Sequence, residues 1–196
     1  MTRTLARSAV AVVVLTAVLG FAYPAIMVGF ASLAFPDGSR GSLVRVDARI
    51  VGSRLAGQSF TWPRYFHSRP SATAPPYNAG ATTFANLGPT SPDLAASVHD
   101  RAEAILKLER PYNPGMTIGD IPVDAVTTSA SGIDPDISPA NAELQSRRVA
   151  AVRKLPLATV ETLIDEATDG RSWGIFGEPG VNVLELNLAL DRSGGR

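Results

Sequence analysis

The stretch SAVAVVVLTAVLGFAYPAIMVGFASLAFP, residues 8–36, decides the architecture, because no charged side chain interrupts its 29 residues. As a helix rising about 1.5 Å per residue it would extend about 43 Å, against a bilayer hydrocarbon core of about 30 Å. We therefore predict a transmembrane anchor in residues 1–36, with surplus length taken up by tilt, a bend at Pro24 or a non-helical exit at Phe35-Pro36. A cleaved signal peptide is the alternative, but its apolar core runs only about 7–15 residues.

The charges beside this stretch predict its orientation. Arg3 and Arg7 lie on the short N-terminal flank, which places that end in the cytoplasm under the positive-inside rule. Residues 37–196 would then form one extracytoplasmic domain of a single-pass cell-membrane protein. The chain has 18 basic and 18 acidic residues, so no excess of positive charge points to nucleic acid. It has no cysteine, which excludes a disulfide framework and thiol catalysis.

The residues after the span predict an α+β fold, a mixed α/β domain with long proline-rich loops. Apolar and charged residues alternate over 42–55, which is typical of a half-buried strand or of a hairpin that turns near Asp47-Ala48-Arg49. Residues 61–92 contain six prolines and five aromatic residues. The prolines exclude an internal helix or a central strand, and the aromatic residues argue against disorder. We predict a long ordered loop there, which we call the aromatic loop.

Helix-start signals and apolar residues at helical spacing predict three helices. Their expected bounds are a Thr90/Asp93 capping box to just before Pro111, Ser138 to about Leu155, and about Thr159 to Thr168. A further loop is expected over residues 127–139. Basic residues gather in the second half of the middle helix, where cations favour the helix dipole: Arg147, Arg148, Arg153 and Lys154.

The C-terminal segment VNVLELNLALD, residues 181–191, fits two structures. Its leucines alternate with Glu, Asn, Ala and Asp, as in a strand. Asn182 followed by Glu185 could instead cap a helix, and Leu, Ala and Glu are good helix formers. Between the two, we favour the strand.

No residue pattern predicts a catalytic centre or a metal site in this chain. His67 and His99 would need further ligands at recognised spacing to bind zinc. Ser129 and Ser131 lie in a TSASG string that lacks the GxSxG elbow. Loop carboxylates such as Asp134 suit turns better than a bound cation. A lone transmembrane helix cannot enclose an ion path. A partner subunit is therefore our first interpretation, and a membrane-anchored extracytoplasmic enzyme or solute-binding protein is the alternative.

Six strings, in order along the chain, resemble the C subunit of Kdp-type potassium-transporting ATPases, the KdpC family. They are GSRLAGQSF (52–60), YFHSRPSA (65–72), NLGPT (86–90), IPVDAVTTSASGIDPDIS (121–138), RVAAVR (148–153) and VNVLELNLALD (181–191). The resemblance implies a non-catalytic accessory subunit of a high-affinity potassium uptake complex. Its partners would be a channel-like potassium-translocating subunit and a P-type subunit that hydrolyses ATP with Mg²⁺.

The resemblance also implies that the subunit stabilises the assembly and serves as a catalytic chaperone that raises nucleotide affinity. The string proposed to contact nucleotide corresponds to Leu55-Ala56-Gly57-Gln58. The predicted topology places this string outside the cell, where ATP is scarce, so we interpret it as a strand-ending turn. An extracytoplasmic cap on the channel-like subunit fits the anchor better.

Candidate partner contacts come from the span and from the strings that carry the resemblance. Ala25 and Gly29 form a small-xxx-small pair, the spacing that lets membrane helices approach closely. The candidates in the domain are Arg69, Asn86 and Asp134. No cofactor-binding residue is predicted with confidence in this chain.

Overall fold

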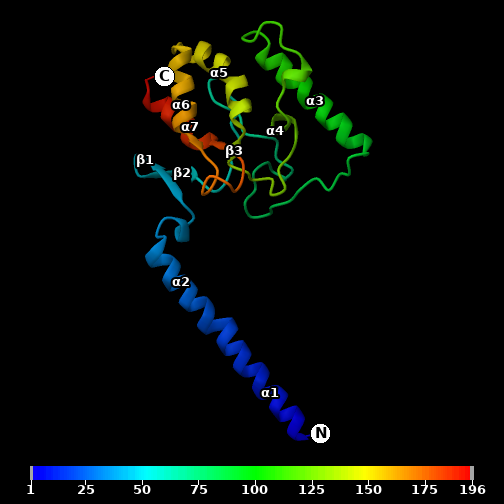
Figure 1. Ribbon diagram of the computed structural model, residues 1–196, viewed down its shortest axis with the longest axis vertical. Coiled ribbons are helices and arrows are strands. Elements are labelled where there is room, and N and C mark those ends of the chain that lie inside the picture. The colour runs from blue at the N-terminus through cyan, green and yellow to red at the C-terminus, as the bar shows by residue number, and fades with distance from the viewer. Residues whose placement is uncertain (1, 195–196) are drawn as a thin grey trace. The chain divides into compact units, whose positions relative to one another are not determined.

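The computed structural model describes residues 2–194 and divides into two compact units, which meet in the sequence between Val51 and Gly52 (Figure 1). In the first unit, α1 (Thr2–Ala17), a π-helical turn (Val18–Ala22) and α2 (Tyr23–Ala34) follow one another without a break. The resulting helix of 33 residues has a mean hydropathy of 2.3 in its most apolar window, and none of that window is buried. It is long and apolar enough to cross a membrane.

The π-helical turn has a local cause in Pro24. Proline has no backbone N–H to donate to the carbonyl four residues earlier, and its ring crowds that carbonyl. The helix widens just before this point, where the N–H of Tyr23 bonds the carbonyl of Val18, five residues back. The helix ends at Phe35, whose φ of −136° and ψ of 65° leave the helical region. The predicted non-helical exit at Phe35-Pro36 is therefore confirmed.

A hairpin follows the span. Its strands are β1 (Leu43–Val46) and β2 (Arg49–Ser53), which pair with each other. Asp47 and Ala48 between them both have left-handed φ values, 48° and 65°, as a two-residue primed turn requires. Of the two arrangements that the alternating sequence allowed, the hairpin is correct.

Up to residue 194, the second unit combines five α-helices and a short 3-10 helix (Ile118–Asp120) with a small sheet. The α-helices are α3 (Pro92–Glu109), α4 (Val123–Val126), α5 (Pro139–Arg153), α6 (Leu157–Glu166) and α7 (Val183–Arg192). The antiparallel sheet has the order β3 (Asp136–Ile137), β5 (Gly180–Asn182), β4 (Thr168–Asp169). The α+β class is confirmed, and β3 lies within the stretch 127–139 that the sequence indicated as a loop.

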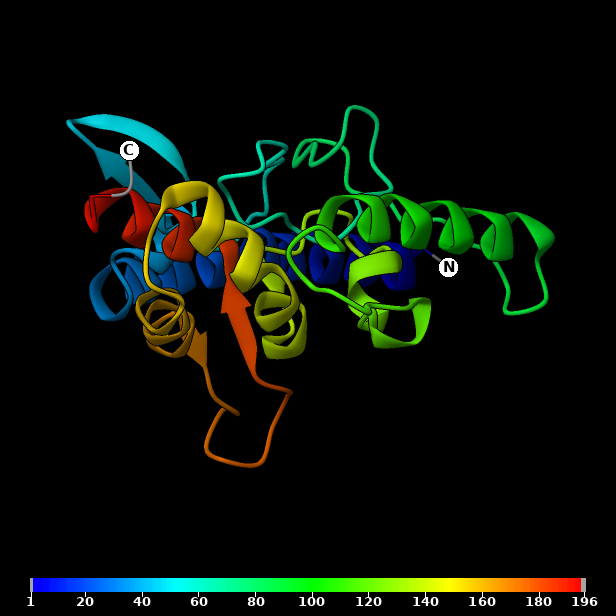
Figure 2. The same cartoon turned by 90° about the horizontal axis from the view of Figure 1, so that it is seen from above.

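The core of this unit lies where α5, α6 and α7 enclose β5 (Figure 2). Leu186 and Leu190 of α7 meet Val149 of α5 and Val160 of α6, and all four are fully buried. Phe66 of the aromatic loop joins the same cluster with 0% exposure. Residues 54–91, all described, contain no helix or strand, which confirms the predicted long loop. Of its rings, Phe66 enters the core, whereas Trp62 and Phe84 are exposed.

The helix starts show which capping signals decided the structure. Ser138 caps α5 as predicted, and its hydroxyl accepts a hydrogen bond from the N–H of Asn141 at 3.1 Å. The capping box at Thr90 is wrong, because the N-cap of α3 is Ser91, without a side-chain hydrogen bond. Pro92 explains the shift: it suits the first helical position, so the residue immediately before it becomes the cap.

The strand favoured for residues 181–191 is also wrong beyond Asn182. Strand β5 ends there, and α7 begins at Val183. The side chain of Asn182 accepts from the N–H of Glu185 at 3.2 Å, which is the cap that the sequence offered as the alternative. The residues that face the core follow the helical period: Val183, Leu186, Asn187 and Leu190.

Candidate functional site: a polar clamp on the aromatic loop

Five consecutive backbone carbonyls of the aromatic loop, those of residues 63–67, each accept a hydrogen bond from a side chain of α5 or α7. Arg148 donates to Pro63 and to Tyr65 (2.9 Å), Arg153 to Arg64 (2.7 Å), Asn187 to Phe66 (3.0 Å), and Gln145 to His67 (3.1 Å). We call these four donor residues the clamp. A buried polar group left without a partner costs about 1–3 kcal/mol. The clamp therefore supplies the hydrogen-bond donors that backbone N–H groups would supply in a sheet or a helix.

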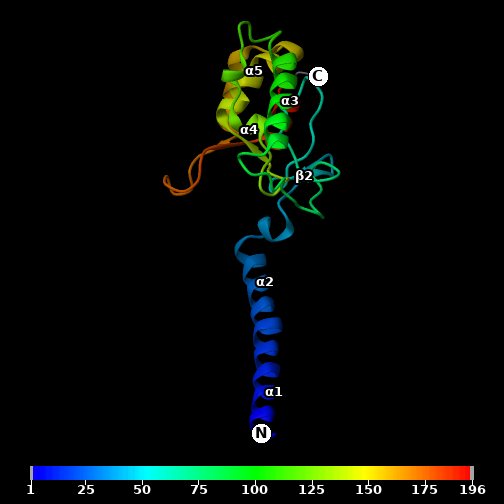
Figure 3. The same cartoon turned by 90° about the vertical axis from the view of Figure 1, so that its right-hand side faces the viewer.

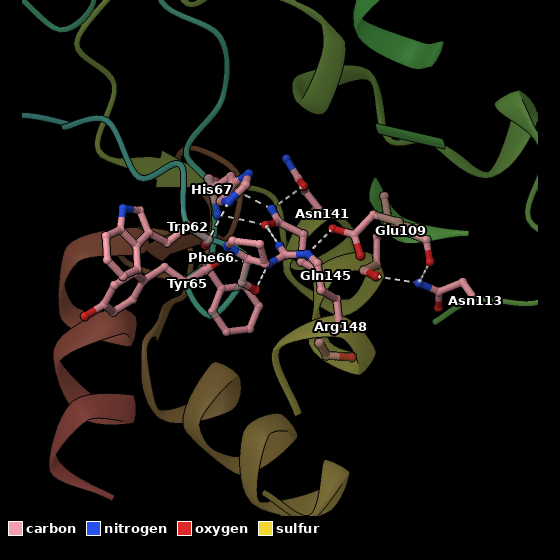
Figure 4. A network of polar contacts seen from close by, with 12 residues as sticks. Trp62, Tyr65, Phe66, His67, Glu109, Asn113, Asn141, Gln145 and Arg148 are labelled. Atoms are coloured by element: carbon pink, nitrogen blue, oxygen red, sulfur yellow. Dashed lines mark hydrogen bonds and ion pairs between the residues drawn. The ribbon is translucent and has the colours of Figure 1, made fainter. Parts of the chain in front are cut away.

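Arg148 is the centre of the clamp (Figure 4). Its side chain is 0% exposed, and its Nε donates to Oε1 of Glu109 on α3 at 2.7 Å. Its Nη2 donates to Oε1 of Gln145 at 2.8 Å. One guanidinium group thus joins α3, α5 and the loop, and its planar fork suits this number of acceptors better than a lysine would.

Two amide side chains hold the loop in the way that a neighbouring strand would. Gln145 accepts from the N–H of His67 at 2.7 Å and donates to the carbonyl of the same residue. Asn187 accepts from the N–H of Phe66 at 2.8 Å and donates to its carbonyl. Both backbone groups of both loop residues are therefore satisfied, which allows the ring of Phe66 to enter the core.

The clamp determines which aromatic side chains of the loop face the domain and which face solvent. Arg153 pairs with Asp191 at 2.8 Å and lies 4.9 Å from the centre of the Tyr65 ring, and the Tyr65 hydroxyl donates to the same carboxylate at 3.1 Å. Trp62 is 67% exposed. It lines an open groove of about 350 Å³ together with Ser59, Phe60, Thr61, Arg64 and Tyr65. The loop thus presents a fixed aromatic surface.

A second, smaller cavity of about 200 Å³ lies between this loop, α3, α4 and α5. Small-molecule sites usually enclose about 300–1,000 Å³, so this space suits a side chain or a few waters. Glu109 lines it, and within residues 2–194 its Oε2 has no hydrogen-bond partner. Burial raises the pKa of Glu109, and the adjacent Arg148 opposes that rise.

His67 lines the same cavity, and its surroundings favour the neutral form of its ring. Burial lowers its pKa, the positive charge of Arg148 lowers it further, and the carbonyl of Trp62 opposes both. That carbonyl lies 3.1 Å from Nε2 of His67 and can only accept, so Nε2 carries the proton of the neutral ring.

This environment predicts a loss of stability in mild acid. The unfolded chain binds a proton at His67 near the ordinary pKa of 6.5, whereas the folded chain resists it. The free energy of unfolding should therefore fall as the pH drops below about 6.5, by up to about 1.4 kcal/mol per pH unit from this residue. Thermal unfolding of the detergent-solubilised chain from pH 8 to 5 would measure the slope. His67→Gln should reduce it, and His99→Gln, at an exposed position on α3, should not. Equal slopes in all three proteins would contradict the assignment.

The structure brings together two of the predicted partner contacts. Arg69 and Asp134 form an ion pair at 2.8 Å, and the carbonyl of Arg69 accepts from the Tyr77 hydroxyl. Asn86 lies exposed in the aromatic loop with a left-handed φ of 52°. Ala25 and Gly29 lie exposed on α2 of the first unit. Contact of these five residues with a partner stays a prediction.

The Leu55–Gln58 string begins in the turn that follows β2, which consists of Arg54 and Leu55. A bridge between Ser53 and Ala56 closes it, and the N–H of Gly57 donates to the carbonyl of Ile133 at 2.8 Å. A Cβ at Gly57 would lie 2.3 Å from the carbonyl oxygen of Asp134, so the backbones approach closely here. These contacts agree with our interpretation of a turn.

Sequence reasoning missed the clamp. It assigned the basic residues of α5 to the helix dipole, but Arg148 and Arg153 are buried, at 0% and 6% exposure, and hold the loop. Only Arg147 is exposed among the three arginines. A usable signal was the spacing of Gln145 and Arg148, three residues apart on one helix face that also carries Val149.

Across residues 2–194, no group of three or more His, Asp or Glu side chains is placed to hold a metal ion. The polar groups of the clamp are used on the protein's own backbone. The arrangement can fix the shape of a loop.

Comparison with known proteins relates this arrangement to one family. The family model "KdpC: K+-transporting ATPase, c chain" matches residues 5–192, a range that contains the span, the aromatic loop and the whole clamp. The potassium-transporting ATPase KdpC subunit of Dechloromonas aromatica is 50% identical over 191 residues, 96% of this chain and 97% of the relative. The KdpC subunit of Burkholderia vietnamiensis is 49% identical over 199 residues, 98% of each chain. That of Sorangium cellulosum is 52% identical over 183 residues, 93% of this chain and 94% of the relative.

Proposed function

The chain belongs to the KdpC family, the c chain of K+-transporting ATPases. We therefore propose that its aromatic loop, held by the clamp and called the clamped loop below, is a contact surface for the other subunits outside the cytoplasm. The chain is a non-catalytic component of the Kdp potassium-transporting ATPase, and the other Kdp subunits are its partners. Family membership thus favours the partner subunit over the anchored enzyme or solute-binding protein.

The five clamped carbonyls support this proposal most directly. Holding an irregular segment in one shape lowers the conformational entropy lost when a partner binds it. The segment exposes Trp62 beside a groove, and tryptophan is enriched among the residues that dominate binding energy. An assembly role explains why α5 uses three of its side chains, Gln145, Arg148 and Arg153, on this loop.

We place residues 37–196 outside the cytoplasm and Arg3 and Arg7 inside. Arg40, Arg45 and Arg49 also follow the span closely. They begin a long domain, however, and long domains are translocated largely regardless of charge. The short N-terminal flank therefore dominates the orientation.

We place the contact of the clamped loop on the channel-like subunit, as an extracytoplasmic cap that stabilises the assembly. Potassium is the ion that the complex transports, and ATP and Mg²⁺ belong to the P-type subunit. The contacts of the Leu55–Gln58 turn lie within its own unit. This supports the cap over direct contact with nucleotide.

Cysteine labelling tests the topology, because the natural chain has no cysteine. Val123→Cys, at a position that is 73% exposed, should react with a membrane-impermeant maleimide in intact cells. Thr4→Cys, on the N-terminal flank, should react only after the cells are permeabilised. The opposite pattern would place the domain in the cytoplasm and contradict the proposal.

The same labelling tests the contact surface. Trp62→Cys should react when the chain is expressed alone and should be protected when the other Kdp subunits are co-expressed. Val123→Cys serves as the reference for general accessibility. If neither cysteine is protected although the complex is intact, the clamped loop does not contact another subunit, and the proposal is wrong.

A further inference from the structure

The loop between β4 and β5 exposes three large apolar side chains. Trp173 is 92% exposed, Ile175 70% and Phe176 59%. We call residues 170–179 the finger. It projects from the second unit, away from α5, α6 and α7 (Figures 2 and 3). A monomeric soluble surface seldom gathers such side chains at one point, and a gathered apolar patch marks an interaction site.

The finger has a fixed shape. At its base, Nη2 of Arg171 pairs with Oε2 of Glu178 at 2.6 Å. Farther out, the backbones of Ser172 and Phe176 exchange two hydrogen bonds, at 2.9 and 3.0 Å. The rings of Trp173 and Phe176 meet edge to face, with centres 6.2 Å apart. These contacts hold the apolar side chains in a defined arrangement.

The backbone of the tip is strained. Trp173 has a left-handed φ of 54°, a region that bulky side chains rarely adopt. Gly174 and Gly177, with φ values of 78° and 79°, form the rest of the turn without such strain. Strained residues persist where the surroundings impose them, and they cluster at functional sites. In this conformation the indole ring of Trp173 points into solvent.

We propose that the finger inserts Trp173 and Phe176 into an apolar recess on the extracytoplasmic surface of another subunit of the potassium-transporting complex. The inference rests on the proposed function, because it requires this domain and its partners to meet outside the cytoplasm. Arg171 and Glu178 neutralise each other, so the finger has no net charge. The recess that receives it therefore needs no charged residue to complement the finger.

Size favours a partner that is already held beside this chain. Aromatic side chains bury about 150–250 Å² each. The three apolar side chains of the finger therefore fall short of the roughly 800 Å² per partner in a standard interface between free proteins. A small contact suffices when both chains belong to one assembly, because the effective concentration is then high.

Shape favours a protein over the bilayer surface. A fluid lipid interface accepts aromatic side chains in many orientations. It would not require a strained tryptophan backbone, or an ion pair that holds the two ends of the finger together. The finger also has no excess of positive charge to attract anionic lipid, since its charges are one arginine and one glutamate. A shaped recess explains both the conformation and the charge.

Photo-crosslinking in the assembled complex tests the contact. With Trp173 replaced by p-benzoylphenylalanine in the full chain, ultraviolet light should join this chain to another Kdp subunit. An adduct with lipid only, an adduct between two copies of this chain, or no adduct would overturn the proposal. Co-purification of the unirradiated complex is the control. If the complex itself fails to form with the natural chain, the proposed function fails, and not only the finger.

Substitutions test the shape of the finger. Trp173→Ala with Phe176→Ala should reduce retention of the chain in the detergent-purified complex at least tenfold, with thermal unfolding unchanged. Gly174→Ala retains all the apolar side chains and adds a Cβ that meets nothing within 4 Å, so it acts through φ alone. It should also reduce retention. Val123→Ala, at another exposed apolar position, should not. Full retention of the double variant would overturn the proposal, and full retention of Gly174→Ala alone would contradict a shaped recess.

Discussion

Replacing Arg148 by methionine is expected to destabilise the domain by about 3–5 kcal/mol, the usual cost of breaking a buried ion pair by removing one partner. Glu109, which is 1% exposed, would lose its counter-charge, and the carbonyls of Pro63 and Tyr65 would lose their donor. For a domain of this size, the loss corresponds to a fall of about 6–20 °C in Tm. Thermal unfolding of the full chain in detergent, followed by circular dichroism, would measure it.

Two further variants show whether the ion pair is the cause. Arg147→Met changes the neighbouring, exposed arginine of the same helix and should shift Tm by less than about 2 °C. Arg148→Met combined with Glu109→Leu removes both charges and should recover part of the stability lost in the single variant. A double variant that is less stable than Arg148→Met would contradict the account. The loss would then come from the loop carbonyls or from packing.

The elements that the sequence predicted correctly are those with strong local signals. The uncharged stretch 8–36 predicted a long helix without any information about the rest of the chain. Likewise, Ser138 and Pro139 alone indicated where α5 begins. Prolines excluded regular structure from the aromatic loop for an equally local reason. In each case the physical cause lies within a few residues of its effect.

The clamp could not be predicted in this way. Arg148 lies 85 residues from Pro63, and Asn187 lies 121 residues from Phe66. In the unfolded sequence, only its position three residues after Gln145 distinguishes Arg148 from Arg147, which remains exposed. The packing of α5 against α6 and α3 determines which arginine faces inward. Local chemistry thus predicted a loop that needed partners, but not which side chains would provide them.

Segment 181–191 shows the same limit at closer range. Its alternating leucines fitted a strand, whereas Asn182 with Glu185 and the helix-forming composition fitted a capped helix. In the structure Asn182 belongs to both elements, because β5 ends on the residue whose side chain caps α7. The strand ends at Asn182, whose pairing with Asp136, 46 residues away in the sequence, is the last of the ladder.

Gly57→Val is expected to prevent normal folding or assembly, because backbone atoms already occupy the space that the new side chain needs. A Cβ there would lie 2.3 Å from the carbonyl oxygen of Asp134 and 3.3 Å from that of Ile133. Relieving this overlap costs about 1–3 kcal/mol or more and separates Gly57 from its hydrogen-bond partner Ile133. Gly119→Val is the matched control, since an added Cβ at this exposed position meets only Oγ1 of Thr117, at 3.7 Å. The yield of purified complex should fall for Gly57→Val alone.

Gln58→Ala then decides between a turn and a nucleotide site. The Gln58 side chain lies against Gly52, whose added Cβ would meet its Oε1 at 2.5 Å, and its carbonyl accepts from Ser68 at 3.0 Å. Because these contacts lie within one domain, Gln58→Ala should leave the ATP concentration for half-maximal turnover of the assembled pump nearly unchanged. A hydrogen bond to a charged phosphate is worth about 1.5–3 kcal/mol, so its loss would raise that concentration about 10- to 150-fold. An ATPase titration on the intact complex resolves such a shift easily. Observing it would place the string beside ATP and the domain in the cytoplasm, and would contradict both the turn and the topology.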